Sequence, residues 1–413
     1  MSLHRYSNAG VLVVMCTLCA CEQWQPNYCP TAPHHNCLEL LDAPSGKSCT
    51  ADLDCFGATA VCDLNGSRTC VQCTSLEPAA CKGMTPVCSA EHVCQGCTAH
   101  AQCASNACLP DGSCSNENMV AYIDPNGTDT PIMGDMCTKR TPCKTVTTAL
   151  ATDRPYVKFH GITDEAVTVN NGRIVTFLAD PDAKLTRTRG NGAILTVQDS
   201  GTSLSVYDLS ISDAPNSPSG IGCVIPIASG APNLKLTRVK VMHNPGGGIS
   251  ISGAQFNITN SIIAANGSES SALGGVQINN ITVGGAHTLD FNTITANFGP
   301  PTINTGVSCS TVLPSLTFSN NIIYANTVSA GGAQVGGDVS CSTSYSDIGP
   351  DGVSGQGNIN ADPLFVSLLQ NFHLMRTSPA RDAADPAATI ADDVDGDPRP
   401  QGSRRDMGAD EIK

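Results

Sequence analysis

Aromatic and charged side chains are scarce in this chain of 413 residues. Aromatics make up 4% and charged residues 14% of the sequence, whereas hydrophobic residues reach 40% and glycine numbers 39. The hydrophobic content excludes a disordered chain. A narrow stacked core of Val, Ile and Leu, with small residues at its corners, is typical of a β-solenoid. The composition therefore favours a solenoid over a compact globule, whose single core stops growing near ~250–300 residues.

Basic residues are also few. The 22 Lys and Arg face 36 Asp and Glu, which gives a formal charge of −14. Nucleic-acid binding requires a basic face, so we exclude nucleic acid as a partner. The sequence contains no phosphate loop, zinc signature or nucleophile motif, and we expect no cofactor.

No apolar run near the N-terminus is long enough to span a bilayer. Residues 11–18 form an apolar core after His4 and Arg5, which predicts a signal peptide over residues 1–20. The run ends Leu18-Cys-Ala-Cys21, which resembles the lipobox of bacterial lipoproteins, although Cys19 departs from it. The resemblance implies a lipid on Cys21, the membrane as a partner, and a location at the outer membrane or cell surface. Cleavage after Ala20 without a lipid is the alternative.

Cysteines are concentrated in the first third of the chain. After a proline-containing linker, residues 21–48, three sets of four begin 24 residues apart and define a repeat region at residues 49–118. The sets are Cys49, Cys55, Cys62, Cys70; Cys73, Cys81, Cys88, Cys94; and Cys97, Cys103, Cys108, Cys114. Units this small cannot bury enough apolar surface to fold unaided, so we predict disulfides in an oxidising compartment. Three connectivities remain open in each set. Zinc at the C-x-x-C joints is the disfavoured alternative. The repeat resembles cysteine-rich spacer modules, which implies a stalk.

Short segments that close on asparagine occupy most of residues 200–330. The closing asparagines are Asn244, Asn266, Asn297 and Asn326, with gaps of 22, 31 and 29 residues. Each segment alternates apolar residues like a half-buried strand, and Asn tolerates left-handed backbone at a turn. The period indicates a parallel β-helix, in which asparagines stacked at one corner form a ladder of hydrogen bonds between coils.

The entry to this region predicts a cap. Residues 142–150 place Val146, Ala149 and Leu150 at helical spacing, where they cover the open end of the first coil. The strand and helix resemble the start of right-handed β-helix proteins of the pectin-lyase-like group. We therefore predict an all-β fold, a right-handed single-stranded parallel β-helix over residues 119–345. Two further disulfides are expected, Cys137 with Cys143 and Cys309 with Cys341, which leaves Cys223 without an obvious partner.

The last part of the chain, residues 346–413, carries the most specific motifs. They are residues 357–366, 371–374 and 378–385, then Asp395-Gly-Asp-Pro-Arg-Pro400 and Asp406-Met-Gly-Ala-Asp-Glu411. In this order they resemble the C-terminal region of the choice-of-anchor Q β-helix proteins. That resemblance covers residues 120–411 and implies an exported bacterial surface protein. Ala384 and Asp410 depart from the pattern, where Gly and an aromatic residue are common.

Candidate catalytic residues are sparse in the repeats. Lys235, Arg238 and Asp290 are the charged residues that a carbohydrate-active enzyme would use, because lyases and hydrolases need carboxylates or a base. The acidic run Asp392, Asp393, Asp395 and Asp397 is a weak calcium alternative that lacks the closing Glu of an EF-hand.

Three histidines, His243, His287 and His373, show no paired metal spacing and are interpreted as structural or surface residues. We expect a structural or adhesive protein whose partner is a polysaccharide or another surface protein. A polysaccharide lyase or hydrolase is the alternative, because the fold alone does not confer the chemistry.

Overall fold

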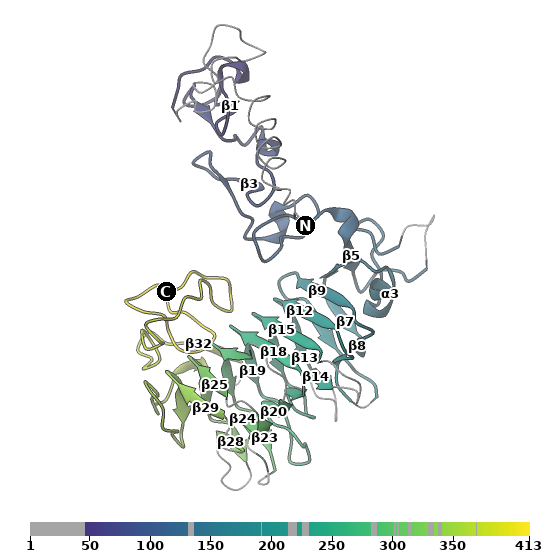
Figure 1. Ribbon diagram of the computed structural model, residues 1–413, viewed down its shortest axis with the longest axis vertical. Helices are drawn as coiled ribbons and strands as arrows, with labels where there is room; N and C mark the ends of the chain where they lie inside the picture. The colour runs from purple at the N-terminus through teal and green to yellow at the C-terminus, as the bar shows by residue number, and fades with distance from the viewer. Residues whose placement is uncertain are drawn as a thin grey trace, which may run out of the picture. The chain divides into compact units, whose positions relative to one another are not determined.

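The chain forms two compact units, residues 1–115 and residues 116–413, which are described separately (Figure 1). The computed structural model describes residues 46–130, 136–190, 192–213, 221–224, 231–281, 287–300, 303, 305–312, 316–328, 334–337, 341–368 and 370–413. The predicted signal peptide, Cys21 and most of the predicted linker lie outside the described residues.

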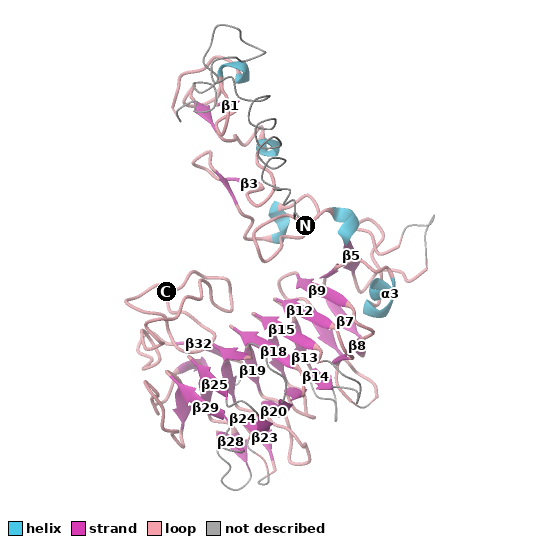
Figure 2. Cartoon of the chain, viewed as in Figure 1, coloured by secondary structure: helices cyan, strands magenta, loops and turns pink. Residues whose placement is uncertain are grey.

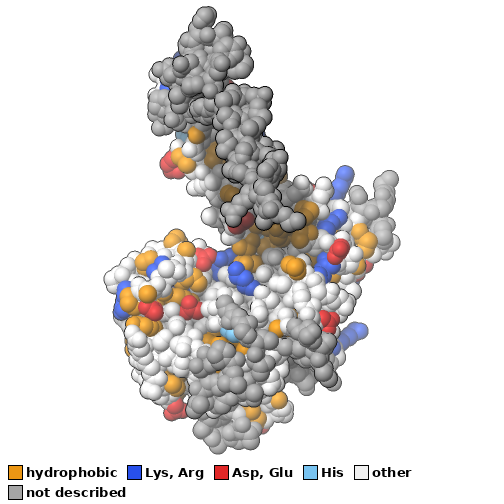
Figure 3. Space-filling model, in the orientation of Figure 1, with side chains coloured by type: hydrophobic (Ala, Val, Ile, Leu, Met, Phe, Trp, Pro, Cys, Tyr) orange, Lys and Arg blue, Asp and Glu red, His pale blue; other side chains and the backbone are white. Residues whose placement is uncertain are grey.

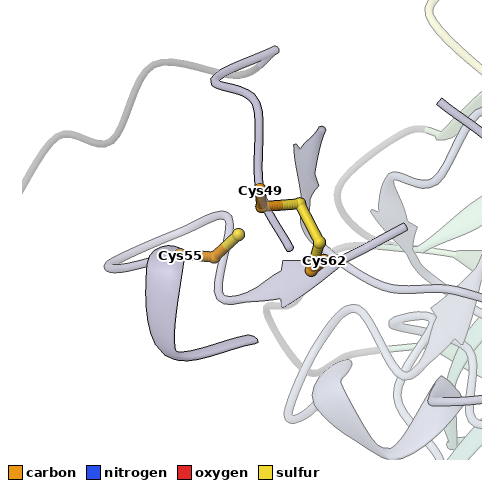
Figure 4. A group of neighbouring side chains, drawn as sticks. All are labelled: Cys49, Cys55 and Cys62. Carbon is orange, nitrogen blue, oxygen red and sulfur yellow. A yellow bond between two sulfur atoms is a disulfide. The ribbon is translucent and has the colours of Figure 1, made fainter. Parts of the chain in front are cut away.

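Disulfides hold the first unit together. In each set of four cysteines the first bonds to the third and the second to the fourth. The bridges are Cys49–Cys62, Cys55–Cys70, Cys73–Cys88, Cys81–Cys94, Cys97–Cys108 and Cys103–Cys114. Figure 4 shows the first of these, with the side chain of Cys55 beside it. The structure thus selects one of the three connectivities left open by the sequence, and the C-x-x-C pairs join successive modules.

The cystines are also the core of these modules. Short elements connect them: η1 (Asp52–Asp54), β1 (Val61–Cys62), β2 (Cys70–Val71), η2 (Pro78–Ala80), β3 (Val87–Cys88), β4 (Cys94–Gln95) and η3 (His100–Gln102). In the first module the four cysteines are buried together, whereas Leu53 is 87% exposed. A bridge that closes a loop of about 15 residues stabilises the fold by about 3 kcal/mol. The unit therefore depends on oxidation, which indicates an extracellular or exported protein.

The second unit is a parallel β-solenoid of three sheets, which confirms the predicted fold class (Figure 2). The nine-stranded sheet contains β5 (Val120–Ile123), β6 (Tyr156–Phe159), β9 (Ile174–Ala179), β12 (Ser203–Tyr207), β15 (Asn233–Thr237), β18 (Gln255–Thr259), β21 (Thr288–Asp290), β25 (Leu316–Ser319) and β29 (Cys341–Ser344). The eight-stranded sheet contains β7 (Ile162–Asp164), β10 (Lys184–Thr186), β13 (Ser210–Ser212), β16 (Lys240–Met242), β19 (Ile262–Ala264), β22 (Thr293–Thr295), β26 (Ile322–Tyr324) and β30 (Asp347–Gly349). The seven-stranded sheet contains β8 (Val167–Val169), β11 (Leu195–Gln198), β14 (Ile221–Val224), β17 (Ile249–Ser252), β20 (Val276–Ile281), β24 (Val307–Val312) and β28 (Val335–Gly337).

Each coil contributes one strand to each sheet, so equivalent residues stack in columns. In the nine-stranded sheet Leu204 pairs with Leu234, which pairs with Phe256, and all three are fully buried. The outward residues between them are polar, which gives the alternating pattern expected of a strand with one buried face. A short additional pair, β23 (Phe298–Gly299) with β27 (Thr327–Val328), extends the stack outside the three sheets.

The closing asparagines form the predicted ladder. Backbone N–H groups of Asn244, Asn266 and Asn297 donate to the side-chain oxygen of the next asparagine at 3.2, 3.1 and 3.1 Å. Asn326 continues the chain to Gln334 at 2.9 Å. All of these asparagines are buried, so each side chain satisfies backbone groups that water cannot reach.

A second ladder lies at the corner between the nine- and eight-stranded sheets. The N–H groups of Ser261 and Asn292 donate to Asn292 and Asn321 at 3.0 and 2.9 Å, and the series continues through Ser346 to Asn358.

The expectation that the closing asparagines themselves adopt left-handed backbone was wrong. The left-handed residues are those directly before them: His243, Ala265, Ala296 and Ala325, with φ of 52–54°. Asparagine is thus selected for its amide side chain, which bonds the neighbouring coil, rather than for its backbone conformation.

A helix closes the first coil as predicted. In α3 (Val146–Ala151), Val146 and Ala149 are buried and Leu150 packs against the core.

Cys137 bonds to Cys143 in the preceding loop, and Cys309 bonds to Cys341 between late coils. Cys223 lies on β14. The short η4 (Glu117–Met119) precedes the first strand. Within the described residues, no helix has the length and apolarity needed to cross a membrane.

The C-terminal region packs against the outside of the eight-stranded sheet. Its hairpin, β31 (Phe365–Ser367) with β32 (Asn371–Leu374), joins a cluster with outward residues of β19 and β26. Gly408 lies so close to Ile322 that an added Cβ would be 2.6 Å from its Cδ1. The N–H of Ala409 donates to the Thr293 hydroxyl at 3.0 Å. This part of the sheet is therefore covered.

Replacing Asn266 by Ala should destabilise the solenoid by about 2–4 kcal/mol. The substitution leaves the N–H and side-chain amide of Asn244 without their acceptor in a buried corner. Asn257→Ala on the outward side of the same coil is the matched control, with an expected change within about 0.5 kcal/mol. Chemical denaturation followed by circular dichroism measures both, and equal losses in the two variants would contradict a ladder.

Candidate functional site

Arg238 and Asp208 lie at the corner between the nine- and eight-stranded sheets. Arg238 has left-handed backbone there, and its guanidinium binds both oxygens of Asp208 at 2.6 and 3.0 Å. Its remaining nitrogen reaches Asp392 of the C-terminal region. Burial opposes the charge, but the Asp208 hydrogen bonds and both carboxylates hold the pKa of Arg238 above its ordinary value. Arg238 therefore links the C-terminal region to the coil through its contacts with Asp392 and Asp208. Because its guanidinium stays protonated, it cannot serve as a base in this state.

The three candidate catalytic residues are not brought together. Lys235 is exposed on β15 and lies 5.4 Å from the ring centroid of Tyr207. Asp290 is on β21, which is separated from β15 by β18. Two strand spacings put the two backbones about 9–10 Å apart. Arg238, in turn, is occupied by its ion pairs.

Asp290 instead lines an open polar cleft of about 430 Å³ between the corner and the C-terminal region. The cleft is lined by Asp290, Ser319, Asn320, Asp385, Ala387, Ala388, Thr389 and Ile390. Burial raises the pKa of Asp290 to about 6, against a 2.8 Å hydrogen bond from Asn320, and the negative charge of Asp385 adds to the rise. A carboxyl group with a raised pKa that shares a cleft with a second carboxylate meets one requirement of acid–base chemistry on a glycoside.

Sequence reasoning missed Asp385. It lies 95 residues from Asp290 in a segment noted only for its family resemblance. The N–H of Asp385 donates to the side chain of Asn320 at 2.7 Å, which places it at the cleft. Nothing in the local sequence indicates this long-range contact.

The outer face of the seven-stranded sheet has a different character. In β8, β11, β17, β20 and β24 the alternating outward residues are neutral and polar: Thr168, Thr196, Gln198, Ser250, Ser252, Gln277, Asn279, Ser308 and Ser310. Ser250 pairs with Gln277 and Gln277 with Ser308, so hydroxyls and amides repeat at the strand spacing. Figure 3 shows one face of the molecule, on which the charged side chains of the second unit are scattered among white surface. We call these nine residues the neutral face.

The acidic run near the C-terminus does not converge on one point. Asp392 binds Arg238 and Asn260. Asp393 accepts backbone N–H groups of Asp395, Asp397 and Glu411 at 2.8–3.0 Å.

The remaining two acidic residues of the run point elsewhere. Asp397 pairs with Lys413 at 2.7 Å, and Asp395 lies 3.1 Å from His373. Each of the four carboxylates therefore has a partner in the structure, and calcium binding by the run stays the weak alternative to the expected absence of a metal.

Arg399 is a further residue whose role the sequence did not reveal. Its side chain is fully buried, lies 4.9 Å from the centroid of the Phe291 ring, and pairs with Glu411 at 3.3 Å. It also donates to the carbonyl oxygens of Asp392, Asp406 and Gly408 at 2.8–3.1 Å. The two motifs that contain Arg399 and Glu411 thus hold the C-terminal region in its folded shape.

Asp347 is a buried acidic residue on the last strand of the eight-stranded sheet. It is fully buried on β30, where one oxygen accepts the Ala361 N–H at 3.1 Å and the other has no hydrogen-bond partner among the described residues. Burial raises its pKa from 3.8 to about 7, and the charge of Asp362 contributes. Asp347 is therefore protonated in the folded protein well above the pH at which it ionises in the unfolded chain.

Comparisons with known proteins add little beyond the fold. A scan against family models gives no match, and neither does a search of curated proteins. Among solved structures the chain is similar to the crystal structure of pectate lyase Pel9A, with 14% sequence identity and a TM-score of 0.41. The match covers 71% of this chain and 96% of that chain. At this level the likeness carries no argument about activity.

Asp347→Asn should reduce the dependence of stability on pH. Because the folded-state pKa of Asp347 is raised, its contribution is fully present below about pH 4 and is lost as pH rises through about 7. Between pH 4 and 8 we expect the free energy of unfolding of the variant to fall less than that of the wild type, by on the order of 3 kcal/mol. Urea denaturation at several pH values measures this. Asp362→Asn, at an exposed neighbour, should retain most of the dependence, and identical pH profiles for Asp347→Asn and wild type would contradict the assignment.

Proposed function

We propose that this chain is a lipid-anchored bacterial surface protein whose β-helix presents an adhesive face without catalysis. The observation that carries the proposal is the neutral face. Repeated hydroxyl and amide groups suit hydrogen bonding along an extended neutral polymer, and the absence of charge among its nine residues avoids the desolvation cost of ion pairs. A polysaccharide is the proposed partner, and another surface protein is the alternative.

The other parts of the chain fit this role. In chain order the disulfide-bonded cysteine modules stand between the N-terminal segment and the solenoid, as expected of a stalk. A diacylated Cys21 would supply membrane affinity at about 0.8 kcal/mol per buried CH₂. The choice-of-anchor Q resemblance at residues 120–411 points to the same surface location.

Lipidation predicts a specific mature N-terminus. We expect the processed protein to begin at Cys21 and to carry the mass of a diacylglyceryl group, because Leu18 and Ala20 place Cys21 at the acceptor position of the lipobox. Mass spectrometry of the N-terminal peptide measures it, with Cys21→Ser as control. An unmodified Cys21 in the exported protein would remove the anchor from the proposal.

The second candidate function is a glycoside hydrolase acting at the Asp290–Asp385 cleft. The observation in its favour is the carboxyl group of Asp290, whose pKa is raised to about 6 beside a second carboxylate. Against it, the described lining of the cleft contains no aromatic ring on which a sugar could stack.

One screen separates the two functions. Ser250→Ala with Gln277→Ala should weaken binding to a neutral polysaccharide by at least about tenfold, since two hydrogen bonds of about 1 kcal/mol each are lost. Thr317→Ala, exposed on the nine-stranded sheet, should leave binding unchanged. Affinity electrophoresis and reducing-end release measure binding and cleavage on the same polymers. Sustained cleavage that Asp290→Asn or Asp385→Asn abolishes would replace adhesion by hydrolysis as the function.

A further inference from the structure

Three side chains of metal-binding types meet within the C-terminal region, and none of them belongs to the lining of the cleft or to the neutral face. His373 comes from β32, Asp395 from the turn after Val394, and Asp410 from the segment before the C-terminus. One ligand atom from each lies within 4.8 Å of the other two. The other groups of this kind among the described residues consist of disulfide-bonded cysteines, whose sulfurs are not thiolates.

The carboxylates of Asp395 and Asp410 each face the imidazole of His373, and each also has a contact with another residue. Asp395 directs Oδ2 to His373 Nε2 at 3.1 Å, while its Oδ1 lies 4.0 Å from Lys240 Nζ. Asp410 is 8% exposed, and its Oδ2 accepts the Leu374 N–H at 2.7 Å. Its Oδ1 lies 4.0 Å from His373 Nδ1 and accepts no hydrogen bond within the described part of the chain. Asp410 thus directs Oδ1 toward the imidazole from a side chain that is 12% exposed.

We propose that His373, Asp395 and Asp410 bind a divalent transition-metal ion of the zinc class. Zinc binds imidazole nitrogen and carboxylate oxygen at about 2.0–2.2 Å, so two of its ligands stand about 3.0–3.5 Å apart. The 3.1 Å between His373 and Asp395 already meets this spacing. Calcium and magnesium prefer sets composed of oxygen alone, and the imidazole disfavours them.

The surrounding charge supports a cation at this point. Two carboxylates, those of Asp395 and Asp410, face one imidazole at 3.1 and 4.0 Å. The ammonium of Lys240 lies 4.0 Å from Asp395 and is 43% exposed, so it balances only part of this charge.

The bound ion would link three segments of the C-terminal region. The three ligands belong to the hairpin, the Asp395-Gly-Asp-Pro-Arg-Pro400 motif and the Asp406-Met-Gly-Ala-Asp-Glu411 motif, which come together only when the C-terminal region is folded. Because the side chains of His373 and Asp395 are 39% and 36% exposed, water can complete the coordination. Metal binding would therefore stabilise the docked C-terminal region, and it does not depend on the adhesive or hydrolytic function proposed above.

Zinc titration of the full exported chain with its disulfides intact tests the site. Isothermal titration calorimetry should show one zinc ion per chain, and zinc at about 100 times its Kd should raise Tm by about 3–5 °C. His373→Ala and Asp410→Asn should each weaken zinc binding by at least about tenfold and remove the Tm shift. Cobalt should give visible absorption bands in the wild type that are absent from both variants.

Asp397→Asn is the matched control, because this carboxylate lies in the same turn and pairs with Lys413 rather than with His373. It should keep both the stoichiometry and the cobalt spectrum. Circular dichroism establishes that each variant is folded, and Asp395→Asn provides a third ligand variant if one of the others misfolds. Zinc binding that persists unchanged in folded His373→Ala would assign the ion to other histidines and overturn the proposal, as would a wild-type protein that binds no zinc.

Discussion

The solenoid depends on satisfying the backbone groups at its buried corners. Each coil turns sharply at the same two places, where peptide N–H groups are removed from both water and the strand ladders, and an unpaired group there costs about 1–3 kcal/mol. The asparagine side chains supply the acceptors: Asn266 receives the N–H of Asn244 and returns its own amide to the carbonyl of Val241 at 2.8 Å. Because each asparagine bonds the neighbouring coil, the ladder also fixes the register of all three sheets.

That register decides what each face of the solenoid can do. With inward positions filled by residues such as Ile251 and Ile278, the alternate positions Ser250 and Gln277 must face outward on the seven-stranded sheet. On the eight-stranded sheet the equivalent outward positions include Ile262 and Ile322, which are apolar and covered by the C-terminal region. One sheet therefore keeps a hydrogen-bonding face, while the next provides the platform on which the chain end folds. Arg238, Asp208 and Asp290 lie at the corner between the nine- and eight-stranded sheets, where the C-terminal region packs, whereas the nine residues of the neutral face carry no charge.

The sequence predicted what repeats or acts locally. The alternation of apolar residues and the spacing of the asparagines predicted the solenoid, and helical spacing at Val146 and Ala149 predicted the cap. It could not predict contacts between distant segments. Asp385 reaches the cleft through Asn320, 65 residues away, and His373, which looked isolated, lies beside Asp395. The pairing of the cysteines was open for the same reason, since spacing alone permits three connectivities and only the folded backbone brings Cys49 near Cys62.

The C-terminal motifs show why a family resemblance and a function must be argued separately. The side chain of Arg399 is fully buried, and its nitrogen atoms are directed to three carbonyl oxygens and to Glu411. A charge buried this deeply persists only with such compensation, because removing one partner would leave the other unpaired in an apolar setting. Asp393 is similarly occupied by three backbone N–H groups. These residues are required for the chain end to fold against β22 and β26, so their pattern identifies a way of closing a solenoid. Any recognition of a partner must then arise from residues that the closure leaves free, and the neutral face on the seven-stranded sheet meets that condition.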